Sequence, residues 1–361
     1  MLRIMTIVGA RPQFIKVATI SKVISQDTSI SEILVHTGQH FDNNMSNIFF
    51  DEMSIPKPDY NLNINGVTHG AMVGRQLEAV EKIIIKENPD MVLVYGDTNS
   101  TLAGALAAVK LNITLAHVEA GLRSFNRNMP EEINRVLADH SSDLLFAPTQ
   151  NAIKNLKSEG IPENKTFLTG DVMLDASLFY RKKAKQPSWF DELKISCGEY
   201  ILATVHRAEN TDNSKRLKSI FDGLASSGEE IILPLHPRTK EKIKEYKIKI
   251  SKNIHIVDSV SYFEMVWLES NCKLICTDSG GVQKEAYFFE KPCITMRDET
   301  EWVELVEDGW NILTGSSSEA ISDAIKSASR PAINNFLYGQ GNAANTIVDI
   351  IKNNILFNLK D

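Results

Sequence analysis

The residues that most clearly suggest chemistry are three carboxylates that follow short apolar runs. Asp97 follows the run Met91–Tyr95. Glu119 follows Thr114–Val118, and Glu131 opens the helical pattern that comes next. Each has a structural alternative, since Asp97 suits a helix cap and Glu131 suits the positive end of a helix dipole. Because all three converge on one strand-end surface, the set predicts general acid/base chemistry.

Two cations follow the first candidate strand, in the run Gly9-Ala-Arg-Pro-Gln-Phe-Ile-Lys16. Gly9 permits a tight turn there, and Pro12 suits the first helical position, where its missing N–H costs nothing. Arg11 and Lys16 then lie near a helix N-terminus, which favours an anion. A plain helix start with two solvated cations remains the alternative for this segment alone.

Two histidines in the second half of the chain also follow candidate strands. His206 comes after Tyr200–Val205 and precedes Arg207, and His236 comes after Glu230–Leu235. A lone histidine is usually structural. Two of them at consecutive strand ends, each with an arginine nearby, favour contact with a polar ligand.

The sharpest motif is Thr277-Asp-Ser-Gly-Gly-Val-Gln-Lys-Glu285, directly after an apolar run. Its Ser279, Gly280 and Gly281 at a helix start predict a cradle of backbone N–H groups for a diphosphate. Glu285, farther along that helix, could accept hydrogen bonds from ribose hydroxyls. The motif is neither the Gly-x-Gly-x-x-Gly fingerprint nor a Walker P-loop, and a plain glycine-rich helix start is the alternative.

An α/β architecture must position these residues, because short apolar runs alternate with segments of 3.6-residue periodicity. Continuous apolar strands between helices predict parallel sheets covered on both faces. The expected strands are Arg3–Val8, Glu32–Thr37, Met91–Tyr95, Thr114–Val118, Leu144–Ala147, Tyr200–Val205, Glu230–Leu235, His255–Val257, Leu274–Thr277 and Pro292–Met296. The expected helices of the first half are Pro12–Ser25, His69–Glu87, Ser100–Lys110, Pro130–Ala138 and Gln150–Gly160.

The segment Leu178–Cys197 breaks this rhythm and is interpreted as a connection between two domains. The length of 361 residues is enough for two domains, each with its own core. We therefore predict two doubly wound, Rossmann-like domains that face a cleft, which is the default binding site.

Composition narrows the class of function. Lys and Arg number 39 against 46 for Asp and Glu, so the net charge of −7 argues against broad nucleic-acid binding. No stretch approaches the ~20 apolar residues of a membrane helix, and we expect a soluble, cytoplasmic protein. Four cysteines are too few for a disulfide framework, and no metal-binding spacing is present.

Together these residues resemble the non-hydrolysing UDP-N-acetylglucosamine 2-epimerases over nearly the whole chain. The motifs that carry the resemblance are ordered and specific. They are Gly9-Ala-Arg-Pro with Lys16, Thr37-Gly-Gln-His40, Gly96-Asp-Thr, His117-Val-Glu-Ala-Gly-Leu-Arg123, Pro130-Glu-Glu-Ile-Asn-Arg135, Thr277-Asp-Ser-Gly-Gly and Tyr338-Gly-Gln-Gly.

The resemblance implies the GT-B-like fold of one glycosyltransferase class, with a last helix (Asn342–Asn354) that returns to the first domain. The expected domains are residues 1–177 plus 342–361, with the acid/base groups, and residues 178–341, which bind UDP. The resemblance further implies that UDP is eliminated to leave a 2-acetamidoglucal and is then added back with inversion at C2. It also implies that the enzyme uses no cofactor or metal and is a homodimer. The implied catalytic residues are Asp97, Glu119, Glu131 and His206; the implied substrate-binding residues are Arg11, Lys16, Arg135, Arg207, His236, Ser279, Gly280, Gly281, Glu285 and Arg297.

At some positions this chain departs from the common pattern of the family. In these departures it is similar to the branch that acts on UDP-2,3-diacetamido-2,3-dideoxyglucuronate for surface polysaccharides such as O-antigen. The common branch has Glu where this chain has Gln13, and Arg-Pro where it has Trp302-Val303. Our hypothesis is that neutral Gln13 removes a repulsion toward the C6 carboxylate of a uronate. Phe41-Asp-Asn-Asn-Met45 does not match the members that have a regulatory UDP-sugar site.

Other readings stay open at this point. The substrate could be UDP-N-acetylglucosamine itself, converted to the mannosamine epimer. A GT-B glycosyltransferase or a hydrolysing 2-epimerase would share the glycine-rich motif, although a transferase would not need three carboxylates. A binding module without catalysis would leave those acids unexplained. The expected partners are a UDP-sugar, UDP and a second copy of the chain, with no nucleic acid and no membrane.

Overall fold

The computed structural model describes residues 1–39, 56–332 and 335–358, without the side chains of Arg11 and residues 355–358. The chain divides into two compact units, Met1–Ala176 with Phe336–Asp361, and Ser177–Asn335. The return to the first unit thus begins at Phe336, earlier than the expected residue 342. The reason is a main-chain contact, because Asp171 N donates to Tyr338 O at 2.9 Å and ties this segment to the first unit.

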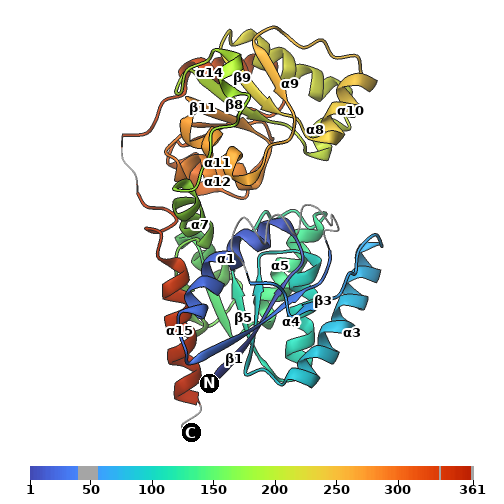
Figure 1. The fold of residues 1–361 in the computed structure, drawn as a ribbon, viewed down its shortest axis with the longest axis vertical. Coiled ribbons are helices and arrows are strands. Elements are labelled where there is room, and N and C mark those ends of the chain that lie inside the picture. The colour runs from blue at the N-terminus through green and yellow to red at the C-terminus, as the bar shows by residue number, and fades with distance from the viewer. Residues whose placement is uncertain (40–55, 333–334, 359–361) are drawn as a thin grey trace. The chain divides into compact units, whose positions relative to one another are not determined.

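The described part of the first unit is built on a parallel sheet in the order β3-β2-β1-β4-β5-β6-β7 (Figure 1). Its strands are β1 Leu2–Val8, β2 Ile30–His36, β3 Tyr60–Asn61, β4 Met91–Tyr95, β5 Thr114–Val118, β6 Leu144–Ala147 and β7 Thr166–Leu168. Its helices are α1 Arg11–Ser25, α3 His69–Glu87, α4 Asn99–Lys110, α5 Pro130–Ser141, α6 Gln150–Ser158 and α15 Ala343–Asn358, with a 3-10 turn η1 at Glu163–Lys165. α7, Val172–Arg181, runs from the first unit into the second.

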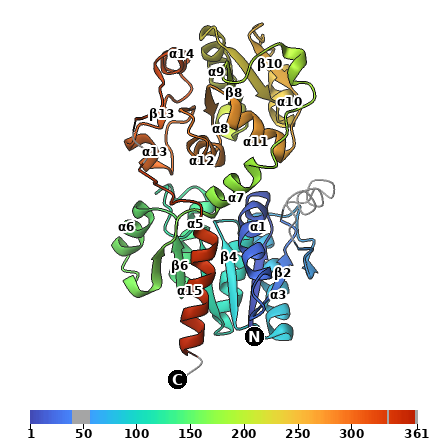
Figure 2. The same cartoon turned by 60° about the vertical axis from the view of Figure 1, so that its left-hand side comes forward.

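Helices pack on both sides of this sheet (Figure 2). α15 lies against α1, so the last helix does join the first unit, and α3, α4 and α5 pack against one another. β4, β5 and β6 match their predicted bounds to the residue, because each is a short run of apolar residues that is almost entirely buried. The short edge strands β3 and β7 were not predicted, since neither carries a clear apolar pattern.

The described part of the second unit has a parallel sheet in the order β10-β9-β8-β11-β12-β13. Its strands are β8 Tyr200–Thr204, β9 Glu230–Pro234, β10 Ile254–Val257, β11 Leu274–Thr277, β12 Cys293–Thr295 and β13 Asn311–Leu313. Its helices are α8 Ala208–Thr211, α9 Ser214–Ser226, α10 Pro237–Glu245, α11 Tyr262–Asn271, α12 Gly280–Phe288, α13 Val303–Glu307 and α14 Ser318–Ser327, with a 3-10 turn η2 at Phe190–Leu193.

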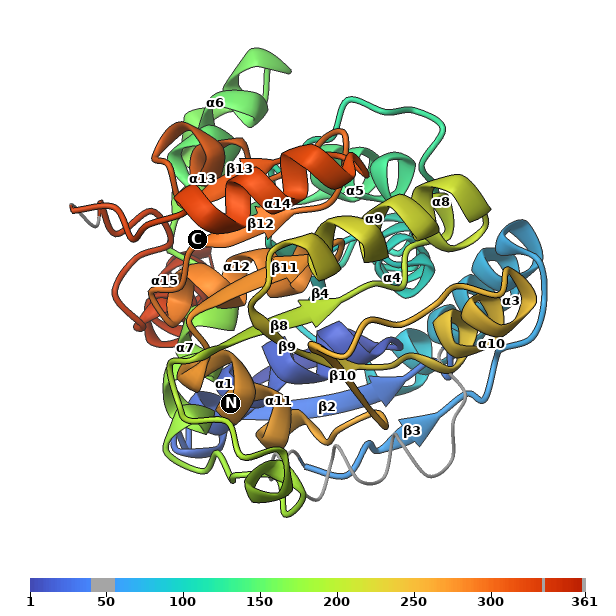
Figure 3. The ribbon, with the colours of Figure 1, turned by 90° about the horizontal axis from the view of Figure 1, so that it is seen from above.

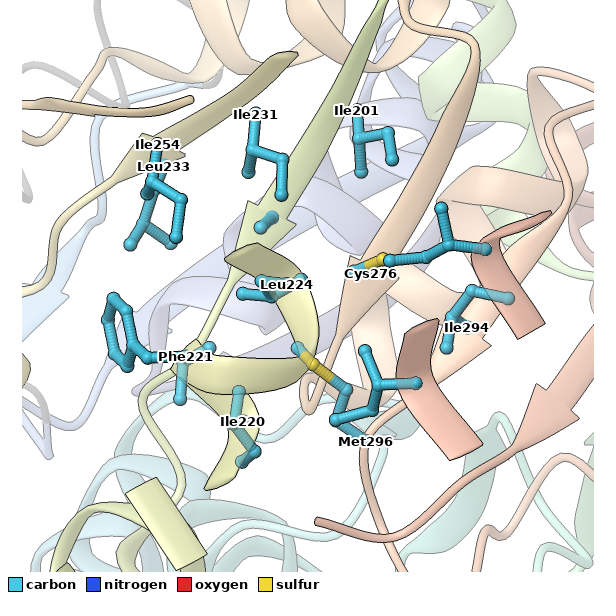
Figure 4. Packing of buried hydrophobic residues seen from close by; sticks show 14 of the residues in the cluster. Ile201, Ile220, Phe221, Leu224, Ile231, Leu233, Ile254, Cys276, Ile294 and Met296 are labelled. Carbon is cyan, nitrogen blue, oxygen red and sulfur yellow. The ribbon is translucent and has the colours of Figure 1, made fainter. Parts of the chain in front are cut away.

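The main core of the second unit lies between its sheet and the helix pair α9 and α14, which run side by side (Figure 3). Ile201 and Leu233 from the strands meet Phe221 and Leu224 from α9 in this core (Figure 4). All four side chains are at most 1% exposed. Truncation of one of these leucines to alanine should cost about 2–5 kcal/mol.

Each sheet has a switch point, where the strand order reverses between two central strands. In the first unit it lies between β1 and β4, and in the second between β8 and β11. Ligands of open parallel sheets bind beyond the carboxyl ends of the strands at such points. No helix among the described residues is long and apolar enough to span a membrane.

Candidate functional site

At the switch point of the first unit, the backbone just after β1 packs closely against neighbouring side chains. A Cβ at Gly9 would lie 2.0 Å from Thr37 Oγ1 and 2.1 Å from Ser100 Oγ. Those two hydroxyls are 2.7 Å apart and hydrogen-bonded to each other. Gly9 is therefore needed for space, rather than for the turn geometry expected from the sequence.

Gln13 joins the ends of β1 and β4. Its Oε1 accepts from Gly9 N at 2.8 Å and from Ala10 N at 3.0 Å. Its Nε2 donates to Tyr95 O at 2.8 Å and to Thr101 Oγ1 at 3.1 Å. The residue is 1% exposed, so the amide is occupied by the protein's own groups. Position 13 therefore acts first on the main chain, and its effect on a sugar carboxylate stays a hypothesis.

Asp97 lies in the turn that follows β4 and is not the helix cap. Thr98 caps α4 instead, with its Oγ1 accepting from Thr101 N. The Asp97 carboxylate forms an ion pair with Arg135 Nη2 and keeps 31% of its side chain exposed. Asp97 therefore combines a fixed position with access to a ligand.

Glu119, directly after β5, has a left-handed backbone with φ of 71°. This conformation is costly for a residue other than glycine and tends to persist where function requires it. Its carboxylate forms an ion pair with Lys16, and both side chains are nearly buried. Gly96 lies beside the pair, since a Cβ there would be 3.1 Å from Lys16 Nζ.

Glu131 and Glu132 stand side by side at the start of α5 but have different surroundings. Glu132 is 2% exposed, and its carboxylate accepts from the N–H groups of Ser124 and Phe125 and from Arg135 Nη1. Glu131 is exposed and lies one helical turn before Arg135. Glu132 thus orders a loop, whereas Glu131 is available to a ligand on the face of α5 that reaches Asp97.

A network of buried polar side chains lies next to the strand ends that carry the candidate acids. His117, fully buried in β5, joins Asp139 Oδ1 at 2.7 Å and Gly96 O at 2.7 Å. Arg123 donates to Asp139 Oδ2 at 2.7 Å and forms a two-point ion pair with Glu159 at 2.7 Å. Burial acts to raise the pKa of Asp139, but His117 and Arg123 outweigh it and lower that pKa. The network fixes both strand ends that carry the candidate acids.

In the second unit, Asp278 joins the ends of β8 and β11. Its fully buried carboxylate accepts from His206 N at 3.1 Å, Arg207 N at 3.0 Å and Asn210 Nδ2 at 3.1 Å. Asn210 also donates to Met296 O at 3.0 Å. Asp278 thereby fixes the turn that carries the first candidate histidine.

His206 and His236 lie close together, with ring centroids 6.1 Å apart. Partial burial of its ring lowers the pKa of His206; Asp278 opposes this shift, and His236 and Arg207 add to it. The His206 ring therefore favours its neutral form. His236 is exposed and caps α10, its Nδ1 accepting from Arg238 N at 3.2 Å. The expected grouping of His206, Arg207 and His236 is thus present in the structure.

The N-terminus of α12 has the form that the glycine-rich motif predicts. Ser279 caps the helix, with its Oγ accepting from Val282 N. A Cβ at Gly280 would lie 2.3 Å from Glu301 Oε1, so a side chain there would displace the carboxylate that pairs with Arg297. A Cβ at Gly281 would meet no atom closer than Ser279 Oγ at 3.9 Å. The absence of a side chain at Gly281 therefore suits the close approach of a ligand to the backbone.

The remaining candidates have mixed outcomes. Arg297 is 2% exposed and pairs with Glu301 Oε2 at 2.9 Å, which favours support of the α12 N-terminus over direct ligand contact. Glu285 lies on α12 and is 8% exposed. Arg11 begins α1, but its side chain lies outside the described residues, as do His40 and the motif Phe41–Met45.

Sequence reasoning missed the residues that hold these groups in place. His117 is the polar residue of an otherwise apolar strand, and a buried polar group needs a partner, so its pattern offered a signal. Asp278 stood inside the glycine-rich motif and was given no role. Asn134 and Asp139 lie on α5, beyond any local signal. Among the described residues, no group of three or more His, Cys, Asp or Glu side chains forms a candidate metal site.

Comparison with known proteins adds an independent line of evidence. The family model described as UDP-N-acetylglucosamine 2-epimerase matches residues 22–352. A UDP-N-acetylglucosamine 2-epimerase homolog of Methanococcus maripaludis is 54% identical over 98% of this chain and 100% of its own. The UDP-2,3-diacetamido-2,3-dideoxy-D-glucuronate 2-epimerase of Pseudomonas aeruginosa is 52% identical over 97% and 99%. The crystal structure of Methanocaldococcus jannaschii UDP-GlcNAc 2-epimerase, in complex with UDP-GlcNAc and UDP, is 46% identical and covers 97% of this chain and 99% of its own, with a TM-score of 0.87.

Proposed function

The chain belongs to the UDP-N-acetylglucosamine 2-epimerase family, and from this premise we propose which sugar it epimerises and which residues act. As a non-hydrolysing 2-epimerase, it eliminates UDP and the C2 proton from a UDP-2-acetamido sugar, and then adds UDP back with a proton on the opposite face of C2. In our proposal the first unit supplies the acid/base groups and the second holds the UDP.

The reaction needs a carboxylate because the C2 proton beside an acetamido group is only weakly acidic. We assign this chemistry to Asp97, Glu119 and Glu131, the three acids at adjoining elements of the first unit. Lys16 and Arg135 each pair with one of these carboxylates and orient it. Arg11 is assigned to the anionic part of the substrate on sequence grounds.

The departing UDP needs hydrogen-bond donors and positive charge. We assign its diphosphate to the N-terminus of α12, at Ser279, Gly280 and Gly281, with His206 and Arg207 beside it. His236 lies near the nucleotide in this proposal. Glu285 accepts from the ribose hydroxyls, and Arg297 holds the α12 N-terminus through Glu301.

One observation carries the assignment of the acids. Glu119 keeps a left-handed backbone, φ 71°, at the end of a buried parallel strand, with its carboxylate paired to Lys16. A strained residue is retained when its side chain must occupy one place, and here that place is beside Gly96, in the turn that carries Asp97.

Two substrates remain to be distinguished. We favour the UDP-2,3-diacetamido-glucuronate, converted to its mannuronate epimer for a surface polysaccharide. The support is the pattern at Gln13 and Trp302 together with 52% identity to the Pseudomonas aeruginosa enzyme of that name. The second candidate is UDP-N-acetylglucosamine, favoured by the structural likeness to the Methanocaldococcus jannaschii enzyme.

Proton NMR in deuterium oxide tests both. Purified protein receives UDP-N-acetylglucosamine in one tube and the diacetamido-glucuronate sugar nucleotide in another. We expect conversion with deuterium at C2 in the second tube alone. Conversion in the first tube alone would overturn our choice of sugar. Free UDP that accumulates with free sugar would indicate a hydrolysing enzyme, and binding without exchange would indicate a non-catalytic module or a transferase.

We further propose that the protein acts as a homodimer in the cytoplasm, where its UDP-sugar is available. Our candidates for the contact are helix α3 and the segment Ile48–Met53, which lies outside the described residues. Light scattering of the purified protein, at several concentrations, decides between a monomer and a dimer.

A further inference from the structure

The turn after β4 is held by side chains from elements on either side of it. Its first carbonyl, Tyr95 O, accepts from Gln13 Nε2 at 2.8 Å and from Thr101 Oγ1 at 2.6 Å. Gln13 comes from α1 and is 1% exposed, and Thr101 comes from α4 and is fully buried.

The next two carbonyls of the same turn are held as well. Gly96 O lies 2.7 Å from His117 Nε2, and because a carbonyl only accepts, this ring nitrogen carries the proton and donates it. Asp97 O accepts from Asn134 Nδ2 at 2.9 Å. His117 belongs to β5 and Asn134 to α5, so three consecutive carbonyls receive donors from four different elements.

Such an arrangement is costly unless it specifies one conformation. Gln13, His117 and Asn134 are 1%, 0% and 5% exposed, and a buried polar side chain destabilises the fold when its hydrogen bonds are broken. A surface turn can satisfy its carbonyls with water instead. Burial of three polar side chains for one turn therefore indicates that its position matters.

The turn carries the carboxylate of Asp97, whose side chain is 31% exposed. Arg135, the residue after Asn134 on α5, pairs with this carboxylate. α5 therefore holds Asp97 at two points, the main-chain carbonyl and the side chain.

We propose that Gln13, His117 and Asn134 are positioning residues, which fix the turn after β4 and thereby aim the carboxylate of Asp97 at the substrate. This inference rests on the proposed 2-epimerase function. In that function, none of the three residues touches the reacting atoms. They act on the rate of the acid/base step and leave UDP affinity to the second unit.

The substitution Asn134→Asp tests this with almost no change in shape. The introduced carboxyl can donate to Asp97 O only while it is protonated. Once ionised, it places a negative oxygen against that carbonyl. We expect kcat for C2 exchange to fall about tenfold per pH unit above the new group's pKa and to reach about 1% of wild type, with KM for the UDP-sugar little changed. The wild type should lack this alkaline decline.

A matched control is Asn253→Asp in the second unit. Asn253 Nδ2 donates to the main-chain carbonyls Glu229 O at 2.9 Å and Ala225 O at 3.4 Å, near the amino ends of the strands. The same exchange of amide for acid there should leave the pH profile of kcat unchanged. Gln13→Ala, which removes the donor to Tyr95 O, serves as a second test variant if Asn134→Asp does not fold.

Amide hydrogen exchange of the peptide that spans residues 95–98 provides a readout independent of activity. We expect faster exchange in Asn134→Asp and Gln13→Ala than in the wild type or Asn253→Asp, under conditions where all four are folded by circular dichroism. An active wild type with unchanged kcat, pH profile and exchange in both test variants would overturn the positioning role. A wild type that exchanges no C2 proton from either UDP-sugar would instead overturn the proposed function.

Discussion

At both switch points, buried side chains fix the turn that follows a central strand, but their hydrogen bonds to the main chain run in opposite directions. In the first unit, side-chain donors such as Gln13 and His117 hold main-chain carbonyls. In the second, the buried carboxylate of Asp278 accepts from the N–H groups of His206 and Arg207. One turn is therefore fixed through its acceptors and the other through its donors.

The groups that these turns present also differ in charge. The first unit presents the carboxylates of Asp97, Glu119 and Glu131. The second presents His206, Arg207 and a helix N-terminus, which suit an anion. In our proposal this difference in charge assigns proton transfer to the first unit and the binding of UDP to the second.

The largest effect is expected from substitution of an acid in the first unit. Glu119→Gln should reduce C2 exchange about 10³-fold, because the amide cannot take up a proton and no longer pairs with Lys16. UDP affinity, measured by calorimetry, should change less than threefold, since we assign it to the other unit. The matched control Glu163→Gln removes an exposed acid paired only with Lys157 and should leave both quantities unchanged. An active Glu119→Gln enzyme would contradict the role of this acid.

The next effect is on the stability of the second unit. Asp278→Asn replaces one acceptor oxygen by an N–H donor that faces the main-chain N–H groups of His206 and Arg207. We expect the free energy of unfolding to drop by about 3 kcal/mol, because buried donors lose their acceptor. Urea denaturation measures this. Asp212→Asn breaks an exposed pair with Arg238 and should cost less than about 1 kcal/mol. Equal losses in the two variants would contradict the special role of Asp278.

A smaller effect should separate binding from folding at α12. Gly281→Ala has open space within the protein and should leave the thermal midpoint equal or slightly higher. The added methyl group stands where we place the diphosphate, so UDP affinity should fall about tenfold, or about 1.4 kcal/mol. Gly280→Ala, by contrast, should be destabilised through its clash with Glu301. Unchanged UDP affinity in Gly281→Ala would move the diphosphate away from this helix end.

The sequence predicted the architecture better than the supports of the site. β4 and β5 were located to the residue because a run of buried apolar side chains is a local signal. β13 was missed because three residues at a sheet edge, only one of them buried, owe their conformation to pairing with β12. The glycine-rich motif also predicted its own helix N-terminus, since capping is a local property.

The roles of Gln13 and Asp278 could not be predicted in the same way. Gln13 Nε2 meets Tyr95 O, 82 positions along the chain, and Asp278 meets His206 N over a separation of 72. Such contacts depend on the order of strands in the sheet, which apolar patterns do not specify. At Asp97 the local pattern was itself misleading. Taken alone, it favoured Asp97 as a helix cap, but Thr98 is the residue that caps α4.

The smallest expected effect concerns the pH dependence of His206, which distinguishes the second switch point from the first. Burial lowers the pKa of His206 below its usual value of about 6.5. Between these two pKa values the unfolded chain binds a proton that the folded chain does not. Stability from this residue is therefore complete above about pH 6.5 and is lost as the pH falls toward the folded pKa. The drop in thermal midpoint from pH 7.5 to pH 5.5 should be smaller in His206→Gln than in the wild type.

UDP reverses this shift if its diphosphate lies beside the ring, because a nearby anion favours the protonated imidazole. Calorimetry at pH 6.5 in two buffers of different ionisation enthalpy should therefore reveal proton uptake when UDP binds to the wild type. His206→Gln should show less uptake, whereas Glu131→Gln, in the first unit, should behave as the wild type. Equal proton uptake in wild type and His206→Gln would place the titrating group elsewhere and remove His206 from the diphosphate, leaving the N-terminus of α12 as the main determinant of UDP binding.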